Sequence, residues 1–252
     1  MDALILAAGF GTRLRPLTLT TPKPLVCVAG IPMVDRVAAR LIAAGADRIV
    51  VNASHLADQV EAHVAAAEWR TPDGRPVETQ VSVEDGAPLE TGGGIRHAAG
   101  FFRRDAPFLV HNGDILTTVD LAALYAAQEA SEATATLAVA PARTDRYLLV
   151  DDAGLVGYAN SGEEWTAREA VGPVRHVDFC GVQACAPRLL DRLDAEPDPT
   201  FSIMTVYLDL ARSPGQVQVC HGMPGAPNTF LDVGTTERLA DAEVAVSAGR
   251  FA

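Results

Sequence analysis

Short strand-like runs alternate with helix-like segments along residues 1–140, and this alternation constrains the fold more than any other feature. The apolar run Asp2–Ala7 ends before a glycine, which is typical of a strand buried on both faces of a parallel sheet. Further strands are predicted at 48–52, 77–83, 107–112 and 134–140, and helices at about 32–45, 56–67, 91–102 and 121–131. We therefore predict an α/β fold with a doubly wound, mostly parallel, Rossmann-like sheet.

The pattern changes at about residue 146. From there to about residue 186 the strands are shorter, turn residues separate them and helical spacing is lost, which predicts a small antiparallel insertion or lid. The remaining predicted elements are helices at 187–193, 203–212 and from about 235, and a strand at 216–220. Because the chain contains no internal repeat and no long linker, we predict one domain over residues 1–252.

Composition excludes several classes of protein. The chain has 32 acidic and 20 basic residues and a net charge of −12, which opposes binding to a nucleic-acid backbone. It contains no apolar run of about 18 residues, and no basic leader follows Met1, so neither a membrane span nor a secretory signal is predicted. We expect a cytoplasmic protein with no nucleic-acid or membrane partner. The sequence does not determine its oligomeric state.

The loop after the first strand is rich in glycine and cations and lacks acids. Its notable residues are, in order, Gly9, Gly11, Thr12, Arg13, Arg15 and Lys23. Glycines let backbone N–H groups approach an anion closely, so the loop is interpreted as a phosphate cradle. It is not a dinucleotide fingerprint, because Leu14 replaces the third glycine, and it lacks the Gly-Lys-Ser/Thr of a Walker loop.

The acidic surroundings of this basic loop predict a divalent cation. A polyphosphate would be repelled by the rest of the chain unless a metal ion accompanied it. Mg²⁺ takes one or two carboxylates together with phosphate oxygens. Asp114, which follows the fourth predicted strand, and Asp232, which precedes the last helix, are the candidate ligands. Cys27, Cys180, Cys185 and Cys220 form no Cys-x-x-Cys pair, and no zinc site is predicted.

Five motifs follow one another along the chain, and together they are specific. They are LAAGFGTRLRPLT at 6–18, PKPL at 22–25, LETGGG at 89–94, NGD at 112–114 and DVGT at 232–235. They resemble the signature of the nucleotidyltransferases that join a nucleoside triphosphate to a sugar 1-phosphate. Within this family the chain is most similar to the short N-acetylmuramate 1-phosphate uridylyltransferases, and next to the mannose-1-phosphate guanylyltransferases.

The resemblance implies an in-line displacement in which a sugar 1-phosphate attacks the α-phosphorus of a triphosphate and pyrophosphate leaves. It implies that Lys23 bridges the two reacting phosphates, that Arg13 faces the pyrophosphate, and that Asp114 and Asp232 hold Mg²⁺. The residues that it places at the nucleotide are Ala8, Gly9, Gly11, Thr12, Arg13, Lys23, Glu84, Thr91, Gly92 and Asn112. A phosphate nucleophile is already deprotonated, so no general base is required.

The choice of substrate stays open at this point. Asn160, Glu163 and Gly181 are expected near the sugar phosphate. The Glu84 carboxylate could accept from guanine N1–H and N2–H₂ or from uracil N3–H, so a GTP-dependent mannose- or heptose-1-phosphate guanylyltransferase is the alternative. Glu90 stands where many relatives have glycine. A catalytically inactive regulatory subunit is the alternative class, and the retained Arg13, Lys23, Asp114 and Asp232 oppose it.

Lys23 is the single lysine among the 20 basic residues. The chain uses arginine wherever a solvated cation suffices, yet it has lysine between Pro22 and Pro24. A compact ammonium with three rotatable donors can follow two phosphate groups, whereas a planar guanidinium is wider. This placement predicts a catalytic role for Lys23.

Overall fold

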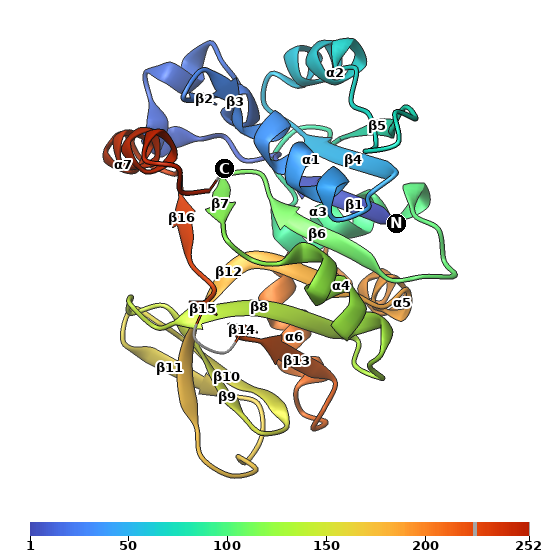
Figure 1. Cartoon of the computed structure of the whole chain (residues 1–252). Coiled ribbons are helices and arrows are strands. Elements are labelled where there is room, and N and C mark those ends of the chain that lie inside the picture. Colours follow the sequence, from blue (N-terminus) through green and yellow to red (C-terminus); the bar gives the residue numbers. More distant parts are fainter. Residues whose placement is uncertain (224–225, 252) are drawn as a thin grey trace.

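A ten-stranded mixed sheet forms the centre of the molecule (Figure 1). The computed structural model describes residues 1–223 and 226–251. The strands of this sheet are β1 (Asp2–Leu6), β4 (Arg48–Ala53), β5 (Glu78–Val83), β6 (Phe108–Asn112), β8 (Ala135–Pro141), β9 (Tyr147–Asp151), β10 (Gly154–Asn160), β11 (Glu163–Thr166), β12 (Arg175–Cys185) and β13 (Val217–Cys220). The order is β11-β10-β9-β12-β6-β1-β4-β5, and β8 pairs with both β12 and β13.

Three short ribbons and seven α-helices accompany this sheet in the described residues. The ribbons pair β2 (Cys27–Val28) with β3 (Ile31–Pro32), β7 (Ile115–Thr117) with β16 (Phe230–Asp232), and β14 (Gly222–Met223) with β15 (Ala226–Pro227). The helices are α1 (Met33–Ala43), α2 (Ala57–Ala66), α3 (Glu90–His97), α4 (Leu121–Glu129), α5 (Arg188–Asp194), α6 (Ile203–Leu210) and α7 (Thr236–Ser247). In the part of the chain that the structure describes, no helix is long and apolar enough to cross a membrane.

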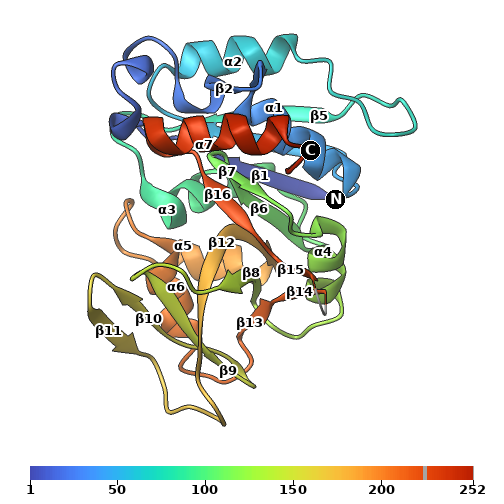
Figure 2. The same cartoon turned by 60° about the vertical axis from the view of Figure 1, so that its left-hand side comes forward.

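Helices cover both faces of the sheet, as the sequence predicted (Figure 2). In β1 the side chains of Ala3 and Ile5 pack toward α1, α2 and α4, whereas Leu4 packs toward α3, α5 and α6. All three residues are fully buried, which explains why the run is continuously apolar. Helix α7 packs separately on the small ribbons through Ala242, which contacts a cluster that includes Val28 and Leu116.

The sheet divides into a parallel and an antiparallel part. Strands β5, β4, β1 and β6 are parallel neighbours, but β12 lies between β6 and β8 and is antiparallel to both. The strand predicted at 134–140 therefore exists but does not pair with the preceding parallel strand. The segment 146–186 is antiparallel, as predicted, yet its last strand belongs to the middle of the sheet. The predicted insertion therefore does not extend to β12, which pairs with β6, β8 and β9.

The loop after β1 contains three single 3₁₀ turns in place of an α-helix. They span η1 (Thr12–Leu14), η2 (Leu17–Leu19) and η3 (Lys23–Leu25), and a further turn, η4 (Ala99–Phe101), follows α3. The prolines explain this geometry, because proline lacks the N–H that a continuing helix requires. Lys23 consequently lies in a short rigid turn between two prolines.

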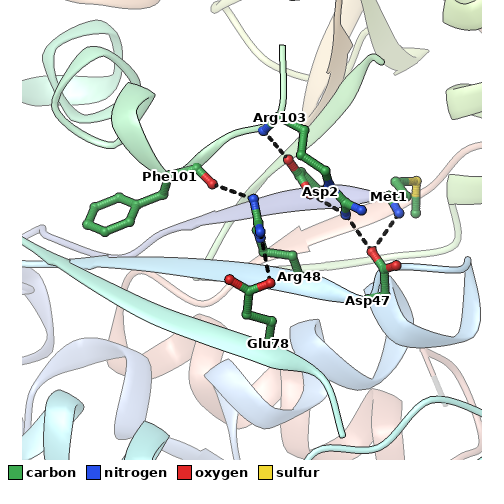
Figure 3. A network of polar contacts seen from close by, with 7 residues as sticks. All are labelled: Met1, Asp2, Asp47, Arg48, Glu78, Phe101 and Arg103. Atoms are coloured by element: carbon green, nitrogen blue, oxygen red, sulfur yellow. Dashed lines mark hydrogen bonds and ion pairs between the residues drawn. The ribbon is translucent and has the colours of Figure 1, made fainter. Parts of the chain in front are cut away.

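A polar network fastens the strand ends that lie opposite the carboxyl ends (Figure 3). Asp2 is almost fully buried and accepts from the backbone N–H and the Nε of Arg103, at 2.6 and 2.7 Å. Arg103 also donates to Asp47 at 2.6 Å, and this contact holds the pKa of the Asp47 carboxyl well below its usual range. Arg48 pairs with Glu78 at 2.8 Å. These contacts hold the parallel strands in place at the ends opposite their carboxyl ends.

A buried ion pair stabilises the antiparallel part. The Asp151 carboxylate accepts from both terminal nitrogens of Arg168, each at 2.7 Å, and from the backbone N–H groups of Ala153 and Val171. The hydrogen bonds from Arg168 lower the pKa of Asp151 to about 2. The Asp151 side chain is completely buried and that of Arg168 is 6% exposed, so each charge depends on the other.

We expect Asp151→Asn to lower the free energy of unfolding by about 3 kcal/mol at pH 7, because Arg168 would remain buried without its counter-charge. The folded pKa of Asp151 is below its unfolded value near 4, so this stabilisation is present above about pH 4 and lost as the pH falls toward about 2. Urea unfolding between pH 2 and pH 7 measures it. In the variant the free energy of unfolding should change less between about pH 4 and pH 2 than in the wild type.

Asp152→Asn is the matched control. Asp152 pairs with Arg175 at 3.1 Å, but the two side chains are 65% and 48% exposed. An exposed pair contributes at most about 1 kcal/mol, so this variant should unfold close to the wild type. Equal losses in the two variants would contradict the assignment of the stabilisation to burial.

Candidate active site

A cavity of about 220 Å³ lies at the carboxyl ends of β1, β4 and β6. Its lining residues are Leu6, Ala7, Ala8, Gly9, Lys23, Pro24, Asn52, Pro88, Glu90, Thr91, Asn112, Gly113 and Asp114. Loops far apart in the sequence therefore converge here, as expected for an open α/β sheet. Of the residues predicted at the nucleotide, the structure places Ala8, Gly9, Lys23, Thr91 and Asn112 in this cavity.

Asn52 shapes the floor of the cavity. Its Oδ1 accepts from the backbone N–H of Ala7 at 2.6 Å and of Ala8 at 3.2 Å, where the glycine-rich loop leaves β1. Its Nδ2 donates to Glu84 Oε1 at 2.5 Å, and Glu84 Oε2 accepts from the backbone N–H of Leu89 at 2.8 Å. Asn52 was missed in the sequence, although it ends a predicted strand, where ligand-facing residues are expected.

Glu84 is not among the residues that line this cavity. Glu84 is almost fully buried, both carboxylate oxygens have partners, and burial raises the pKa of its carboxyl. It lies beneath the cavity and holds Asn52 and Leu89 in position. The prediction that Glu84 contacts the nucleotide base is therefore not supported by the geometry.

The glycines of the LETGGG motif allow α3 to pack closely. A Cβ on Gly92 would lie 2.4 Å from the Phe201 ring, and one on Gly93 would lie 2.4 Å from the Pro199 carbonyl oxygen. Gly92 also donates its N–H to the Phe201 carbonyl at 2.9 Å. The structure thus turns Gly92 toward the loop before α6 and away from the cavity, while the neighbouring Thr91 lines it.

The glycine-rich loop after β1 bends at Gly11. Gly11 has a φ of +62°, and a Cβ there would lie 2.8 Å from Cγ2 of Thr18, so a side chain is excluded. The Thr18 hydroxyl donates to the Gly11 carbonyl at 2.7 Å and closes the bend. Thr12 and Arg13 follow on the exposed side of η1. The guanidinium of Arg13 reaches Gly234, where an added Cβ would lie 2.7 Å from it.

The two predicted metal ligands lie on neighbouring backbone segments. In the β7–β16 ribbon Asp232 is opposite Ile115, and the Val233 N–H donates to the Asp114 carbonyl at 2.7 Å. Lys23 Nζ forms an ion pair with Asp114. Asp232 Oδ2 accepts from Arg238 at 2.8 Å, while Asp232 Oδ1 is buried and has no hydrogen-bond partner among the described residues.

These residues fit a magnesium ion that is completed by phosphate oxygens. Among the residues that the structure describes, no group of three or more His, Cys, Asp or Glu side chains could hold a metal ion alone. Mg²⁺ requires only one or two carboxylates when phosphates supply further oxygens. The unpartnered Oδ1 of Asp232 and the carboxylate of Asp114 are such a pair.

A second cavity, of about 440 Å³, shares Asn112 and Asp114 with the first. Its other lining residues are Arg13, Ile115, Thr144, Asp145, Arg146, Tyr147, Leu148, Tyr158, Asp178, Phe179, Gly181, Met204, Phe230, Asp232 and Arg238. It therefore contains both predicted metal ligands. We call it the acceptor cavity, because Gly181, one of the residues expected near the sugar phosphate, lines it.

The structure brings one of three predicted sugar-phosphate residues into the acceptor cavity. Gly181 lines it, in a bulge of β12 with a φ of +69°. A Cβ on Gly181 would lie 3.0 Å from Nδ2 of Asn112, so the glycine leaves room for the Asn112 side chain. Asn112 lines both cavities. Asn160 and Glu163 form the exposed last pair of the β10–β11 hairpin, outside both cavities. For these two the geometry gives no support to sugar contact.

Comparisons with known proteins identify the family of this chain. The sequence profile of the nucleotidyl transferase family matches residues 2–148. An N-acetylmuramate alpha-1-phosphate uridylyltransferase from Caulobacter vibrioides is 35% identical over 216 residues, which are 83% of this chain and 84% of that protein. A mannose-1-phosphate guanylyltransferase from Mycobacterium tuberculosis is 38% identical over 138 residues, which are 54% of this chain and 36% of that protein.

Solved structures show the same fold. HddC from Yersinia pseudotuberculosis, crystallised with GMP-PN, superposes with a TM-score of 0.72 at 22% identity and covers 97% of this chain and 99% of its own. UDP-glucose pyrophosphorylase from Acinetobacter baumanii superposes with a TM-score of 0.74 at 16% identity and covers 98% of this chain and 93% of its own. The chain therefore belongs to the nucleotidyl transferase family. Its activity is that of a sugar-1-phosphate nucleotidyltransferase.

Proposed function

We propose that this enzyme transfers the uridylyl group of UTP to N-acetylmuramate 1-phosphate, forming a UDP-sugar and pyrophosphate. The observation that carries the proposal is the similarity to the Caulobacter uridylyltransferase over most of both chains. The Mycobacterium guanylyltransferase matches over about half of this chain and about a third of its own length. The reaction suggests a role in recycling peptidoglycan sugars.

In the proposed mechanism the enzyme acts by positioning the substrates and neutralising their charge, and it forms no covalent intermediate with them. An oxygen of the sugar phosphate attacks the α-phosphorus in line with the leaving pyrophosphate, and Lys23 lies where the two cavities meet, beside Asp114. Its ammonium neutralises charge on both reacting phosphates. Arg13 stabilises the departing pyrophosphate, and the backbone of Gly9, Gly11 and Thr12 cradles the phosphates.

Asp114 and Asp232 would hold Mg²⁺ in this site. When bound, the ion would neutralise phosphate charge and orient the triphosphate for in-line attack. Asp114 pairs with Lys23 and would also bind the metal ion, so its carboxylate would position both. The deprotonated phosphate nucleophile requires no general base, and the proposed residues include none.

The guanylyl alternative retains one specific supporting observation. Glu84 is buried outside the lining of the first cavity, and both its oxygens already accept from Asn52 and Leu89. Glu90, however, lines the first cavity, and a carboxylate there could accept from guanine N1–H and N2–H₂ together. A GTP-dependent mannose- or heptose-1-phosphate guanylyltransferase is therefore the second candidate.

Pyrophosphate release with a panel of substrates tests the proposal. UTP, GTP, ATP and dTTP are each combined with the 1-phosphates of N-acetylmuramate, N-acetylglucosamine, glucose, mannose and heptose in the presence of Mg²⁺. We expect the highest kcat/KM with UTP and N-acetylmuramate 1-phosphate. A preference for GTP over UTP of about tenfold or more would contradict the nucleotide assignment. Nucleotide binding without turnover in any combination would support the regulatory alternative.

Glu90 provides a prediction about stability and function together. Its φ of +60° is strained for a residue with a Cβ, yet its side chain lines the cavity. We expect Glu90→Gly to raise the free energy of unfolding by about 0.5–1 kcal/mol and to lower kcat/KM for the triphosphate severalfold. Thermal unfolding and steady-state kinetics measure the two effects.

Ala29→Gly is the control for this variant. Ala29 has a φ of +48° in the turn between β2 and β3, away from both cavities. The Ala29→Gly variant should gain stability by the same relief of strain, and its kinetic constants should equal those of the wild type. If Glu90→Gly gains stability without losing activity, Glu90 has no role at the nucleotide.

A further inference from the structure

The acceptor cavity contains an arginine without an acidic partner. Arg146 lines this cavity, and in residues 1–223 and 226–251 no carboxylate lies within ion-pair distance of it. Its Nε donates to the Tyr158 hydroxyl at 2.8 Å, and its Cζ lies 5.9 Å from the centre of the Tyr158 ring. These contacts orient the guanidinium and leave its two terminal nitrogens available for a ligand.

The tyrosine that holds Arg146 is itself fixed. Tyr158 stacks on Trp165 of β11, with ring centres 5.8 Å apart and an angle of 16° between the planes. Tyr147, the residue after Arg146, stacks on His176 at 4.4 Å. Arg146 lies at the surface, but its contact with the stacked Tyr158 holds it in position.

In the proposed reaction residues other than Arg146 bind the phosphates. Lys23 pairs with Asp114, which lines both cavities, and Asp232 pairs with Arg238. Arg146 belongs to another wall, because β9 and β10 are separated from β1 by β12 and β6 in the sheet order. A cation on this wall would face the part of the sugar that is remote from its 1-phosphate.

The acids of the acceptor cavity do not neutralise this cation. Asp178 is almost fully buried and accepts from the backbone N–H of Arg143 at 2.9 Å and from the Thr144 hydroxyl at 3.2 Å. Asp145 precedes Arg146 and lines the cavity, but none of the ion pairs of the described residues joins the two side chains. In a chain of net charge −12, a fixed free guanidinium in a substrate cavity is suited to a second anionic group.

We propose that Arg146 binds the carboxylate of a carboxylated sugar 1-phosphate and so determines which sugar is accepted. The inference rests on the proposed function, because N-acetylmuramate differs from N-acetylglucosamine by an O3-lactyl ether that ends in a carboxylate. A guanidinium binds a carboxylate through two parallel hydrogen bonds. The 1-phosphate would lie toward Lys23 and the lactyl carboxylate toward Arg146.

The test compares two acceptors that differ in the lactyl group. The ratio of kcat/KM for N-acetylmuramate 1-phosphate to that for N-acetylglucosamine 1-phosphate is measured with saturating UTP. We expect wild-type enzyme to favour the carboxylated sugar, and Arg146→Met to reduce the ratio by about tenfold to a hundredfold. A loss of structure would lower both constants together and leave the ratio unchanged.

Arg143→Met is the matched control. Arg143 lies on the same segment, its described hydrogen bond to Asp178 uses the backbone N–H, and it lies outside the lining of the acceptor cavity. Its ratio should equal that of the wild type. Arg146→Lys keeps the charge but loses the paired donors, and its ratio should fall between those of wild type and Arg146→Met.

The outcomes separate this inference from the proposed function. If wild-type enzyme uses both acceptors with UTP equally well, or if Arg146→Met leaves the ratio unchanged, the role of Arg146 is wrong while the reaction stands. If wild-type enzyme does not use N-acetylmuramate 1-phosphate with UTP, the proposed function and this inference both fail, and the wild type alone shows it.

Discussion

Lys23→Arg is expected to lower kcat by roughly 10²- to 10³-fold although it preserves the charge. Lys23 is held in the η3 turn, its side chain is 16% exposed, and its ammonium contacts Asp114. The position that a Cβ on Gly11 would occupy lies 3.3 Å from the Lys23 Cβ, so the loop is close to the stem of the side chain. A guanidinium is longer and planar, and it would enter the space through which the phosphate nucleophile approaches.

Single-turnover kinetics with saturating UTP and sugar phosphate measures this effect on the chemical step. Arg15→Lys is the matched control, because it makes the reverse exchange in the same exposed loop, outside both cavities. It should retain activity. Near wild-type turnover of Lys23→Arg would show that a positive charge alone suffices and would refute the argument from the shape of the ammonium.

The local sequence predicts most elements of the parallel half. Strand β1 and its neighbours are recognisable because they are buried on both faces, and a strand buried on both faces has a continuous apolar run in its sequence. The position of β12 is not recorded in this way. Its pairing with β6, β8 and β9 depends on partners that are distant in sequence, and turn residues near it indicate only that the chain becomes antiparallel.

The site shows the same distinction between local and distant information. The motif residues Lys23, Asn112 and Asp114 converge because loops at the carboxyl ends of parallel strands must meet. The direction of Glu84 was not predictable, because the residue after β5 can turn toward the cavity or into the core. Asn52, more than thirty residues earlier, decides the direction by binding the Glu84 carboxylate.

The glycines illustrate a further limit. The resemblance to the nucleotidyltransferases placed Gly92 at the nucleotide. In the structure the close neighbour of Gly92 is Phe201, more than a hundred residues away. At Gly92 only the folded chain shows that the close neighbour is another part of the protein.

Asp114→Asn is expected to lower kcat by about 10²-fold or more and to weaken the dependence of the rate on Mg²⁺. Asparagine keeps the size of the side chain and can still accept one hydrogen bond, but it removes the charge that holds Lys23 and that would bind the metal. The unpartnered Oδ1 of Asp232 would then be the remaining carboxylate oxygen for the ion.

Titration of the rate with Mg²⁺ at fixed UTP distinguishes the two roles of Asp114. If Asp114 only orients Lys23, the maximal rate falls while the half-saturating Mg²⁺ concentration stays constant. If it also binds the metal, that concentration rises as well, by about tenfold for the loss of one charged ligand. Asp120→Asn is the control, because Asp120 caps α4 through Ala123 at 2.9 Å and asparagine caps a helix equally well. An unchanged Mg²⁺ response in Asp114→Asn would remove Asp114 from the metal site and leave Asp232 as its one proposed side-chain ligand.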